Sequence, residues 1–182
     1  MFMSLIQKRR SIRKFIQRPV EDEKMDLLVE AALRAPSSMG NMPWSFFIVK
    51  DRDLLEELSR AKSHGSSFLR NAPLGILICA DSEKSDVWIE DASIAATFIF
   101  LMAESLGLGA CWIQLRRRNH SDKITAEAYV TELLNIPGNL KVLSIIALGY
   151  PDEIKPPHEK ESLKYERAYL DTFGKPYQNR DI

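Results

Sequence analysis

The hydrophobic positions of this chain follow helical spacing in some segments and form short apolar runs in others. Residues 22–34 carry an apolar stripe that Pro36 must end, made of Met25, Leu28, Val29, Ala32 and Leu33. The aromatic-rich segment 45–50 predicts a short strand. Asp51 is then a suitable N-cap for a helix that ends near Lys62.

The middle of the chain combines a covered strand with the longest predicted helix. A polar Gly/Ser loop at 63–67 precedes the unbroken apolar run 74–80, which predicts a strand covered on both faces. Residues 85–106 predict a helix whose second half has few polar positions. Such a helix is buried, either in a core or against a partner chain. Gly107 and Gly109 end it.

The last third predicts two more strands, one helix and a polar tail. ACWIQ predicts a strand, residues near 121–134 a helix, and 142–150 a last buried strand closed by a proline. The segment 151–182 is too polar to form its own core, yet it contains Tyr165, Tyr169, Phe173 and Tyr177. We therefore expect one α+β domain over residues 1–182, with three layers, a mixed sheet flanked by helices, and a tail that packs on a neighbouring subunit.

Composition excludes some partners. Lys+Arg and Asp+Glu each total 25, so the chain has no general attraction to nucleic acid or anionic membranes. The longest strongly apolar stretch, 92–103, is too short for a membrane span, and the first residues lack the apolar core of a signal peptide. We expect a cytoplasmic protein.

Cys79 and Cys111 lie in apolar runs and predict buried thiols, with no disulfide framework or metal site.

Two segments have residues suited to ligand chemistry. Residues 8–14 bring together five cations and Ser11, a set that suits a phosphate group, although a solvated basic helix end has the same composition. A nucleic-acid site is disfavoured because no aromatic residues interleave with these cations. Residues 35–44 form a Pro/Ser/Gly/Asn loop that can offer backbone hydrogen bonds beside an apolar wall to a flat ring. An ordinary tight connection is the alternative.

Together these segments carry a family resemblance. RRSIRKF, a helix, APSS followed by PWSF, then DAS, GLGACWI and IIALGYP occur in an order that resembles the nitroreductase family of FMN-dependent oxidoreductases. The resemblance covers about Ser4 to Lys160. It implies a homodimer with a nitroreductase-like, mostly antiparallel sheet, FMN bound at the dimer interface, and a C-terminal extension that embraces the partner.

The resemblance also implies FMN contacts at individual residues. Arg9, Arg10 and Ser11 match positions that hold the phosphate and ribityl chain. His158 and Lys160 fall where the family often has two basic phosphate ligands. These five positions together would form the phosphate end of the site.

Other positions would surround the flavin ring. Arg13 matches a basic position at the pyrimidine edge, and Gln114 and Leu115 match positions whose backbone amides face the ring near N5. A loop from the second subunit would cover the ring with three residues: Pro36, Ser37 and Ser38.

Three positions depart from the family pattern. Gly40 stands where Asn is usual and Met42 where Gln is usual. We expect either change to remove a side-chain hydrogen bond to the flavin, for which the neighbouring Asn41 can compensate, or to alter access to the ring. Leu115 stands where small residues are common, which would narrow the pocket. These departures affect substrate choice more than FMN binding.

The implied reaction passes electron pairs from NADH or NADPH to small acceptors such as nitroaromatics or quinones, by ping-pong kinetics. No acid or base residue is required; Arg13 would stabilise negative charge on the reduced ring. Two alternatives stay open: another flavin reaction such as reductive dehalogenation, or a flavin-binding module or sensor with little turnover.

Other conspicuous residues favour structural interpretations. His64 is expected in an exposed loop and His120 beside a helix cap. Residues 116–118, three consecutive arginines, fit either a solvated loop or attraction of a nicotinamide phosphate. The three tryptophans, Trp44, Trp88 and Trp112, predict core or interface packing.

Overall fold

A four-stranded antiparallel sheet organises the chain, which a computed structural model describes over residues 2–177. The strands are β1 (Trp44–Val49), β2 (Leu74–Asp81), β3 (Gly109–Gln114) and β4 (Leu140–Gly149), in the order β1-β2-β4-β3. Within the described residues the one parallel pairing is an isolated bridge between Ser11 and Ala110 at the β3 edge. The expected α+β class with a mostly antiparallel sheet is confirmed.

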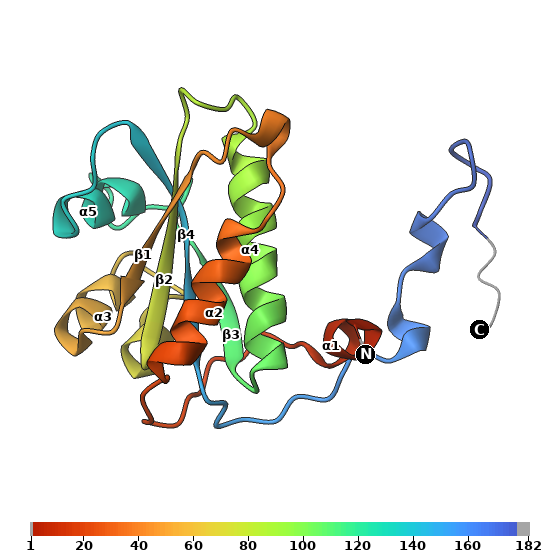
Figure 1. Ribbon diagram of the computed structural model, residues 1–182, viewed down its shortest axis with the longest axis horizontal. Helices are drawn as coiled ribbons and strands as arrows, with labels where there is room; N and C mark the ends of the chain where they lie inside the picture. The colour runs from red at the N-terminus through yellow and green to blue at the C-terminus, as the bar shows by residue number, and fades with distance from the viewer. Residues whose placement is uncertain (1, 178–182) are drawn as a thin grey trace.

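Helices cover both faces of the sheet (Figure 1). On one face lie α2 (Asp22–Leu33) and α4 (Trp88–Ser105), and on the other α3 (Arg52–Ser59) and α5 (Ala126–Leu133). A short first helix, α1 (Phe2–Lys8), contacts α4. Four 3-10 segments complete the fold: η1 (Ser38–Gly40), η2 (Ser67–Asn71), η3 (Lys160–Ser162) and η4 (Tyr165–Arg167).

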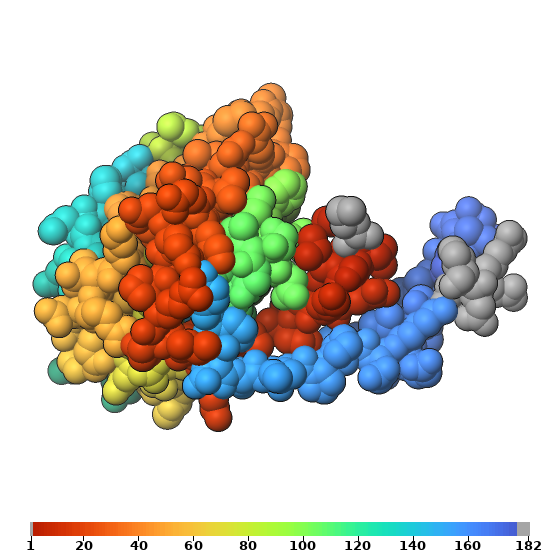
Figure 2. Space-filling model, turned by 60° about the horizontal axis from the view of Figure 1, so that its bottom comes forward, coloured from red at the N-terminus to blue at the C-terminus, as the bar shows by residue number. Residues whose placement is uncertain are grey.

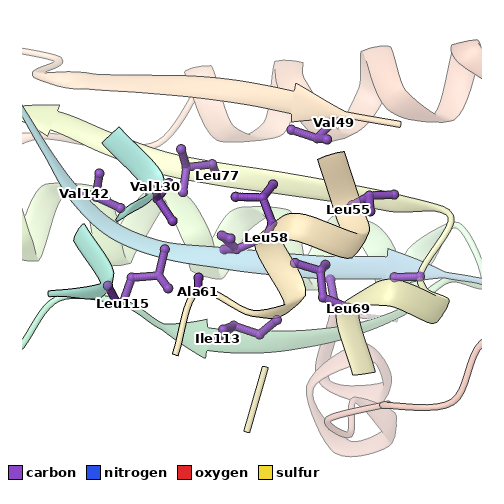
Figure 3. Packing of buried hydrophobic residues seen from close by; sticks show 14 of the residues in the cluster. Val49, Leu55, Leu58, Ala61, Leu69, Leu77, Ile113, Leu115, Val130 and Val142 are labelled. Atoms are coloured by element: carbon purple, nitrogen blue, oxygen red, sulfur yellow. The ribbon is translucent and has the colours of Figure 1, made fainter. Parts of the chain in front are cut away.

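The two faces carry separate apolar cores because side chains alternate across a strand. Figure 3 shows the core beneath α3 and η2, where Leu55, Leu58 and Leu69 pack towards the strands. On the opposite face Leu28 of α2 and Ile99 of α4 meet strand residues such as Ile76. All residues of β2 are buried, as the apolar run predicts.

Several predicted boundaries are wrong, and each has a local cause. The helix expected over 85–106 begins at Trp88, because the turn before it is held by hydrogen bonds to Asp81 and Asp91. The helix expected near 121–134 begins after Thr125, whose side chain caps it by accepting from Ala128 N at 3.0 Å. The helix after Asp51 ends at Ser59, before the expected Lys62.

Smaller corrections concern the bounds of three strands and the buried face of α2. The strand expected over 45–50 is shifted by one residue, to Trp44–Val49, and the ACWIQ strand begins at Gly109. The last strand covers Leu140–Gly149 instead of 142–150. The predicted α2 stripe is wrong at Leu33, which is 53% exposed, while Ala31 is buried.

The segment after Pro151 extends away from the body (Figures 1 and 2). Ile154 is 99% exposed and Phe173 is 89% exposed, and the tyrosines at 165, 169 and 177 are also exposed. The aromatic side chains therefore do not pack on the core of their own chain. The end of the expected tail, residues 178–182, lies outside the described residues.

Candidate functional site

The basic segment after α1 lies along the free edge of β3. Ile12 N donates to Ala110 O at 3.0 Å, and Ile16 N donates to Tyr150 O at 2.9 Å, so the segment is held like an additional strand. Gly109 permits this approach: a Cβ there would lie 2.8 Å from Ile12 Cβ. These contacts fix where the neighbouring cationic side chains emerge.

The start of the C-terminal segment closes over the same residues. Lys155 Nζ donates to Ser11 O at 2.6 Å and pairs with Glu153 at 3.1 Å. Glu153 also accepts from Arg13 N at 2.5 Å, and that backbone hydrogen bond is the main reason why the pKa of Glu153 is lowered. Lys155 is a residue that the sequence reasoning missed; it follows the last strand closely and precedes two prolines.

Arg9, Arg10 and Arg13 project from this segment in different directions. The Arg9 guanidinium lies 5.8 Å from the Phe100 ring centroid, beside a cavity of about 390 Å³ lined by Ile6, Arg9, Ser11, Thr97, Phe100 and Leu101. Arg10 donates to Pro156 O, and Arg13 lies over Phe68, 5.9 Å from the ring centroid. Within residues 2–177 no carboxylate forms an ion pair with these three arginines. Their charges thus remain available to an anion.

The two tail candidates lie further out. His158 and Lys160 are exposed, and Lys160 begins η3. The Arg10 contact with Pro156 brings the start of the tail to the basic segment, only two positions before His158. Lys155, however, is the tail cation that directly contacts Ser11.

The serine loop at 36–43 is anchored to the beginning of α4. Asp91, only 2% exposed, accepts from Ser38 N through Oδ1 at 2.8 Å and from Ser85 Oγ through Oδ2 at 2.8 Å. Ser37 Oγ accepts from Met42 N at 3.0 Å and closes the loop internally. Asp91 is a second positioning residue that sequence reasoning missed, although its place in the first helical turn suits a carboxylate.

The loop holds an unusual backbone. Met39 (φ 52°), Gly40 (φ 70°) and Met42 (φ 45°) all have left-handed conformations. Such conformations are unfavourable for residues with a Cβ, so tertiary contacts must hold them. Met39 is 92% exposed, and Asn41 is exposed with its N–H donating to Ser38 O at 3.0 Å. The exposed rim of the loop is therefore apolar as well as polar.

Within one chain the basic segment and the serine loop contact different parts of α4. Arg9 meets Phe100 and Ser38 meets Asp91, nine positions apart on one helix. At about 1.5 Å per residue this separation is roughly 13 Å along the helix axis. Figure 1 shows the loop and α1 near opposite ends of α4.

Gln114 and Leu115 lie at the end of β3, where a bulge in β4 alters the pairing. The bulge leaves Leu143 O to accept from both Leu115 N (3.2 Å) and Arg116 N (3.0 Å). The Leu115 side chain is fully buried in the core beneath α3 and η2. Its expected narrowing of the pocket stays a prediction. Gln114 Nε2 donates to Arg116 O at 2.9 Å, and Gln114 Oε1 accepts from Trp112 Nε1 at 2.9 Å.

The histidines and cysteines lie where the sequence predicts them. His64 is exposed, as expected. His120 lies beside helix ends, as expected: its backbone N donates to Ile124 O at 2.9 Å, next to the Thr125 cap of α5. Its Nδ1 lies 2.9 Å from the carbonyl O of Arg60, the C-cap residue of α3, and its ring stacks on Tyr129 with 4.0 Å between centroids. Both cysteines are free and buried, and burial raises the pKa of Cys79 to about 12 and also raises that of Cys111.

All three tryptophans pack against the apolar cores, as expected. Trp44 is buried, and Trp88 and Trp112 are partly buried against the α2/α4 core. No helix in residues 2–177 has both the length and the apolar character needed to cross a membrane.

Comparison with known proteins supplies independent information. The model of the nitroreductase family matches residues 6–65 and 60–150. An FMN-dependent nitroreductase from Clostridium difficile R20291 is 48% identical, with a TM-score of 0.92 and coverage of 94% of this chain and 99% of that one.

Two curated relatives extend the comparison. A protein of Archaeoglobus fulgidus, provisionally named NADH dehydrogenase/NAD(P)H nitroreductase, is 37% identical over 163 residues, covering 87% of this chain and 90% of its own length. An FMN reductase [NAD(P)H] of Bacillus subtilis is 29% identical over 185 residues, covering 88% and 71% respectively. The matches thus span most of the folded body.

Proposed function

The chain belongs to the nitroreductase family, and on this basis we propose that it binds FMN and passes electron pairs from NADH or NADPH to small acceptors such as nitroaromatics and quinones. Similar proteins carry the names FMN-dependent nitroreductase and FMN reductase. The observation that carries the proposal is the set of three guanidinium groups beside Ser11, none of which has an ion pair within residues 2–177, on a segment held against the β3 edge.

The donors present fit the phosphate of FMN. Arg9 and Arg10 offer forked N–H donors, Ser11 offers a hydroxyl, and Lys155 adds a cation that is already in contact with Ser11. Beside Arg9 lies an apolar cavity wall provided by Ile6 and Phe100. We propose that His158 and Lys160 join this end of the site when the tail is ordered on a partner.

A homodimer would complete the site. Because Ser38 is anchored far along α4 from Arg9, we propose that the serine loop roofs the ring bound by the other subunit. The exposed apolar residues of α1 and the tail favour the same arrangement, since Phe2, Met3 and Phe173 are each more than half exposed. Pro36, Ser37, Ser38, Gly40 and Asn41 would then contact the ring from the partner side.

Bound FMN supplies the redox chemistry, accepting a hydride from the nicotinamide and returning an electron pair to the acceptor. The protein residues would orient the flavin and stabilise its reduced form. Arg13 would face the pyrimidine edge, where its cation favours the reduced, anionic ring over the neutral oxidised one. The end of β3, at Gln114 and Leu115, would border the ring near N5. Because donor and acceptor would use the same exposed face in turn, we expect ping-pong kinetics.

One experiment tests both binding and the Arg13 role. The purified protein should be yellow, should bleach with NADPH or NADH, and should recover with a quinone. A protein that takes up no FMN from excess refutes the proposal, whereas a flavin that neither nicotinamide bleaches favours a binding module. Arg13→Gln should lower the midpoint potential by roughly 30 mV or more, equivalent to about 1.4 kcal/mol for two electrons. Lys14→Gln, at the adjacent exposed cation, is the matched control, and an unchanged potential in Arg13→Gln refutes that role.

A further inference from the structure

A second cationic cavity lies where the loop after α3 meets the loop after β3. Its volume is about 420 Å³, and it is lined by Lys62, Ser63, His64, Arg117, Arg118 and Asn119. Two loops that are remote in sequence thus place three basic side chains around one hollow. No carboxylate contributes to the lining.

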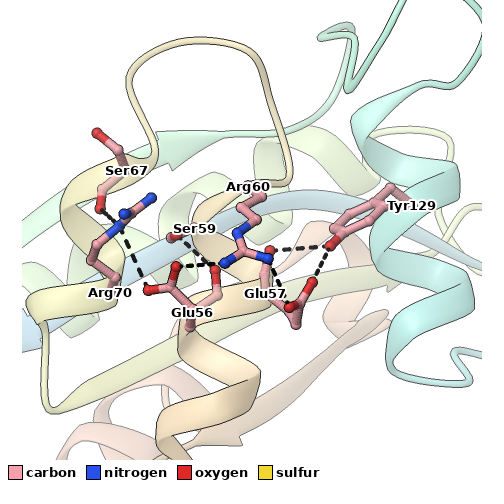
Figure 4. Close-up of polar contacts among 7 residues, drawn as sticks. All are labelled: Glu56, Glu57, Ser59, Arg60, Ser67, Arg70 and Tyr129. Carbon is pink, nitrogen blue, oxygen red and sulfur yellow. Dashed lines mark hydrogen bonds and ion pairs between the residues drawn. The ribbon is translucent and has the colours of Figure 1, made fainter.

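These cations contrast with the ion pairs directly beside them. Figure 4 shows Arg60 bound to both Glu56 (2.9 Å) and Glu57 (3.0 Å), and Arg70 paired with Glu56 (3.6 Å). Lys62, only two positions after Arg60, has no ion pair with any residue in the described range. Nor have Arg117 and Arg118. Carboxylates are therefore available nearby, yet the fold leaves this cluster without them.

The electrostatic environment of Lys62 is positive and favours the binding of an anion. Burial lowers the pKa of Lys62, and the nearby Arg118 charge lowers it further. Arg117 and Arg118 are exposed and Lys62 is half-buried. Like charges held close together repel one another, and a bound anion would relieve that repulsion.

Hydrogen bonds hold both loops that line the cavity. Ser66 Oγ donates to Ser59 O at 2.8 Å and fixes the loop after α3. His120, hydrogen bonded to Arg60 O at 2.9 Å, joins the two loops. Arg118 O accepts from Ala126 N at 2.9 Å, which ties the arginine run to the start of α5.

The cavity lies beside the proposed flavin site. Ser66 is followed directly by η2, whose Phe68 lies under the Arg13 guanidinium at 5.9 Å. The arginine run follows Gln114 and Leu115, the proposed neighbours of N5. A ligand stacked on the flavin would therefore have this cationic hollow within the same surface region.

We propose that this cavity binds the 2′-phosphate of NADPH and makes the enzyme prefer NADPH to NADH. The inference rests on the proposed function, in which a nicotinamide donor reduces the flavin. NADPH differs from NADH only by that phosphate, which carries about −1.5 to −2 charge near neutral pH. Two arginine forks and an ammonium group suit such a dianion.

The first test measures binding without turnover. Adenosine 2′,5′-bisphosphate and 5′-AMP are titrated into the purified protein by calorimetry, at two salt concentrations. The bisphosphate should bind the native protein roughly 10-fold or more tightly than 5′-AMP, and the difference should shrink at high salt. Arg117→Gln/Arg118→Gln and, separately, Lys62→Gln should reduce that ratio towards unity. Equal binding of the two nucleotides to the native protein overturns the inference.

The second test measures flavin reduction by each nicotinamide. In the double variant, the apparent dissociation constant for NADPH should rise roughly 10-fold or more while that for NADH changes little. Arg52→Gln, at an exposed cation outside both sites, is the control and should leave the preference intact. An equal loss for NADH and NADPH, or no loss for either, overturns the inference. Failure of the proposed function is distinguishable, since it would show as absence of bound flavin, which the nucleotide titration does not require.

Discussion

Asp91 allows the anchoring of the serine loop to be tested by mutation. Its carboxylate is buried and accepts two hydrogen bonds of 2.8 Å, one from Ser38 N and one from Ser85 Oγ. Asp91→Ala removes both acceptors and leaves these donors without partners in a site from which water is largely excluded. A hydrogen bond to a charged group contributes about 1.5–3 kcal/mol, and an unsatisfied buried group costs about 1–3 kcal/mol. We therefore expect Asp91→Ala to lower the free energy of unfolding by about 3 kcal/mol.

The loop itself should respond more than the rest of the fold. Met39 and Met42 have left-handed backbones, each unfavourable by roughly 1–3 kcal/mol, so releasing the anchor favours another loop conformation. FMN affinity should then fall, because the loop would no longer present Ser37 and Ser38 to the ring.

Two further variants grade the effect. Ser85→Ala removes one of the two hydrogen bonds and should cost about half as much as Asp91→Ala. Asp91→Asn keeps an acceptor for Ser38 N, and the Ser85 hydroxyl can accept from the new amide, so we expect a loss of about 1 kcal/mol. Urea unfolding gives the stabilities, and quenching of FMN fluorescence gives the affinities. If Asp91→Ala unfolds within about 0.5 kcal/mol of the native protein, the anchoring argument is refuted.

Two other predictions follow from the pKa shifts. Tyr150 donates to Glu21 at 2.6 Å and helps to lower the carboxyl pKa from 4.5 to about 2, so this interaction stabilises the fold above pH 4.5 and is lost as the pH falls towards 2. Tyr150→Phe should therefore flatten the acid side of the stability curve measured by circular dichroism, and an unchanged curve would contradict the assignment. Burial raises the pKa of Cys79 to about 12 and also raises the pKa of Cys111. Neither thiol should therefore react with a disulfide reagent at pH 8 until denaturant is added. Rapid reaction of the native protein would show that one of the thiols is accessible.

Elements determined by local patterns could be predicted from the sequence. Asp51 caps α3 as expected, its side chain accepting from Leu54 N at 2.9 Å, because capping depends only on residues three positions apart. The burial of β2 and β4 is predicted correctly by their apolar runs, since a continuously apolar strand requires cover on both faces.

The missed features depend on contacts between distant segments. α4 begins later than its apolar pattern predicts because Ser85 bonds to Asp91 instead of continuing the helix. No local pattern marks Lys155, because its role comes from contact with Ser11, which lies 144 positions earlier. The proposed roles of His158 and Lys160 stay predictions, because spacing in a variable tail does not determine which of its cations lies nearest the basic segment.

The exposed tail has a consequence for how the stability of this protein should depend on its amount. Ile154, Leu170 and Phe173 leave large apolar side chains in water, and covering each of them fully would contribute about 1.5–3 kcal/mol. In the proposed dimer that contribution comes only from association. Mass action then links folding stability to dimer association. Dilution should lower the melting temperature, and the protein should become more heat-resistant as its own concentration rises.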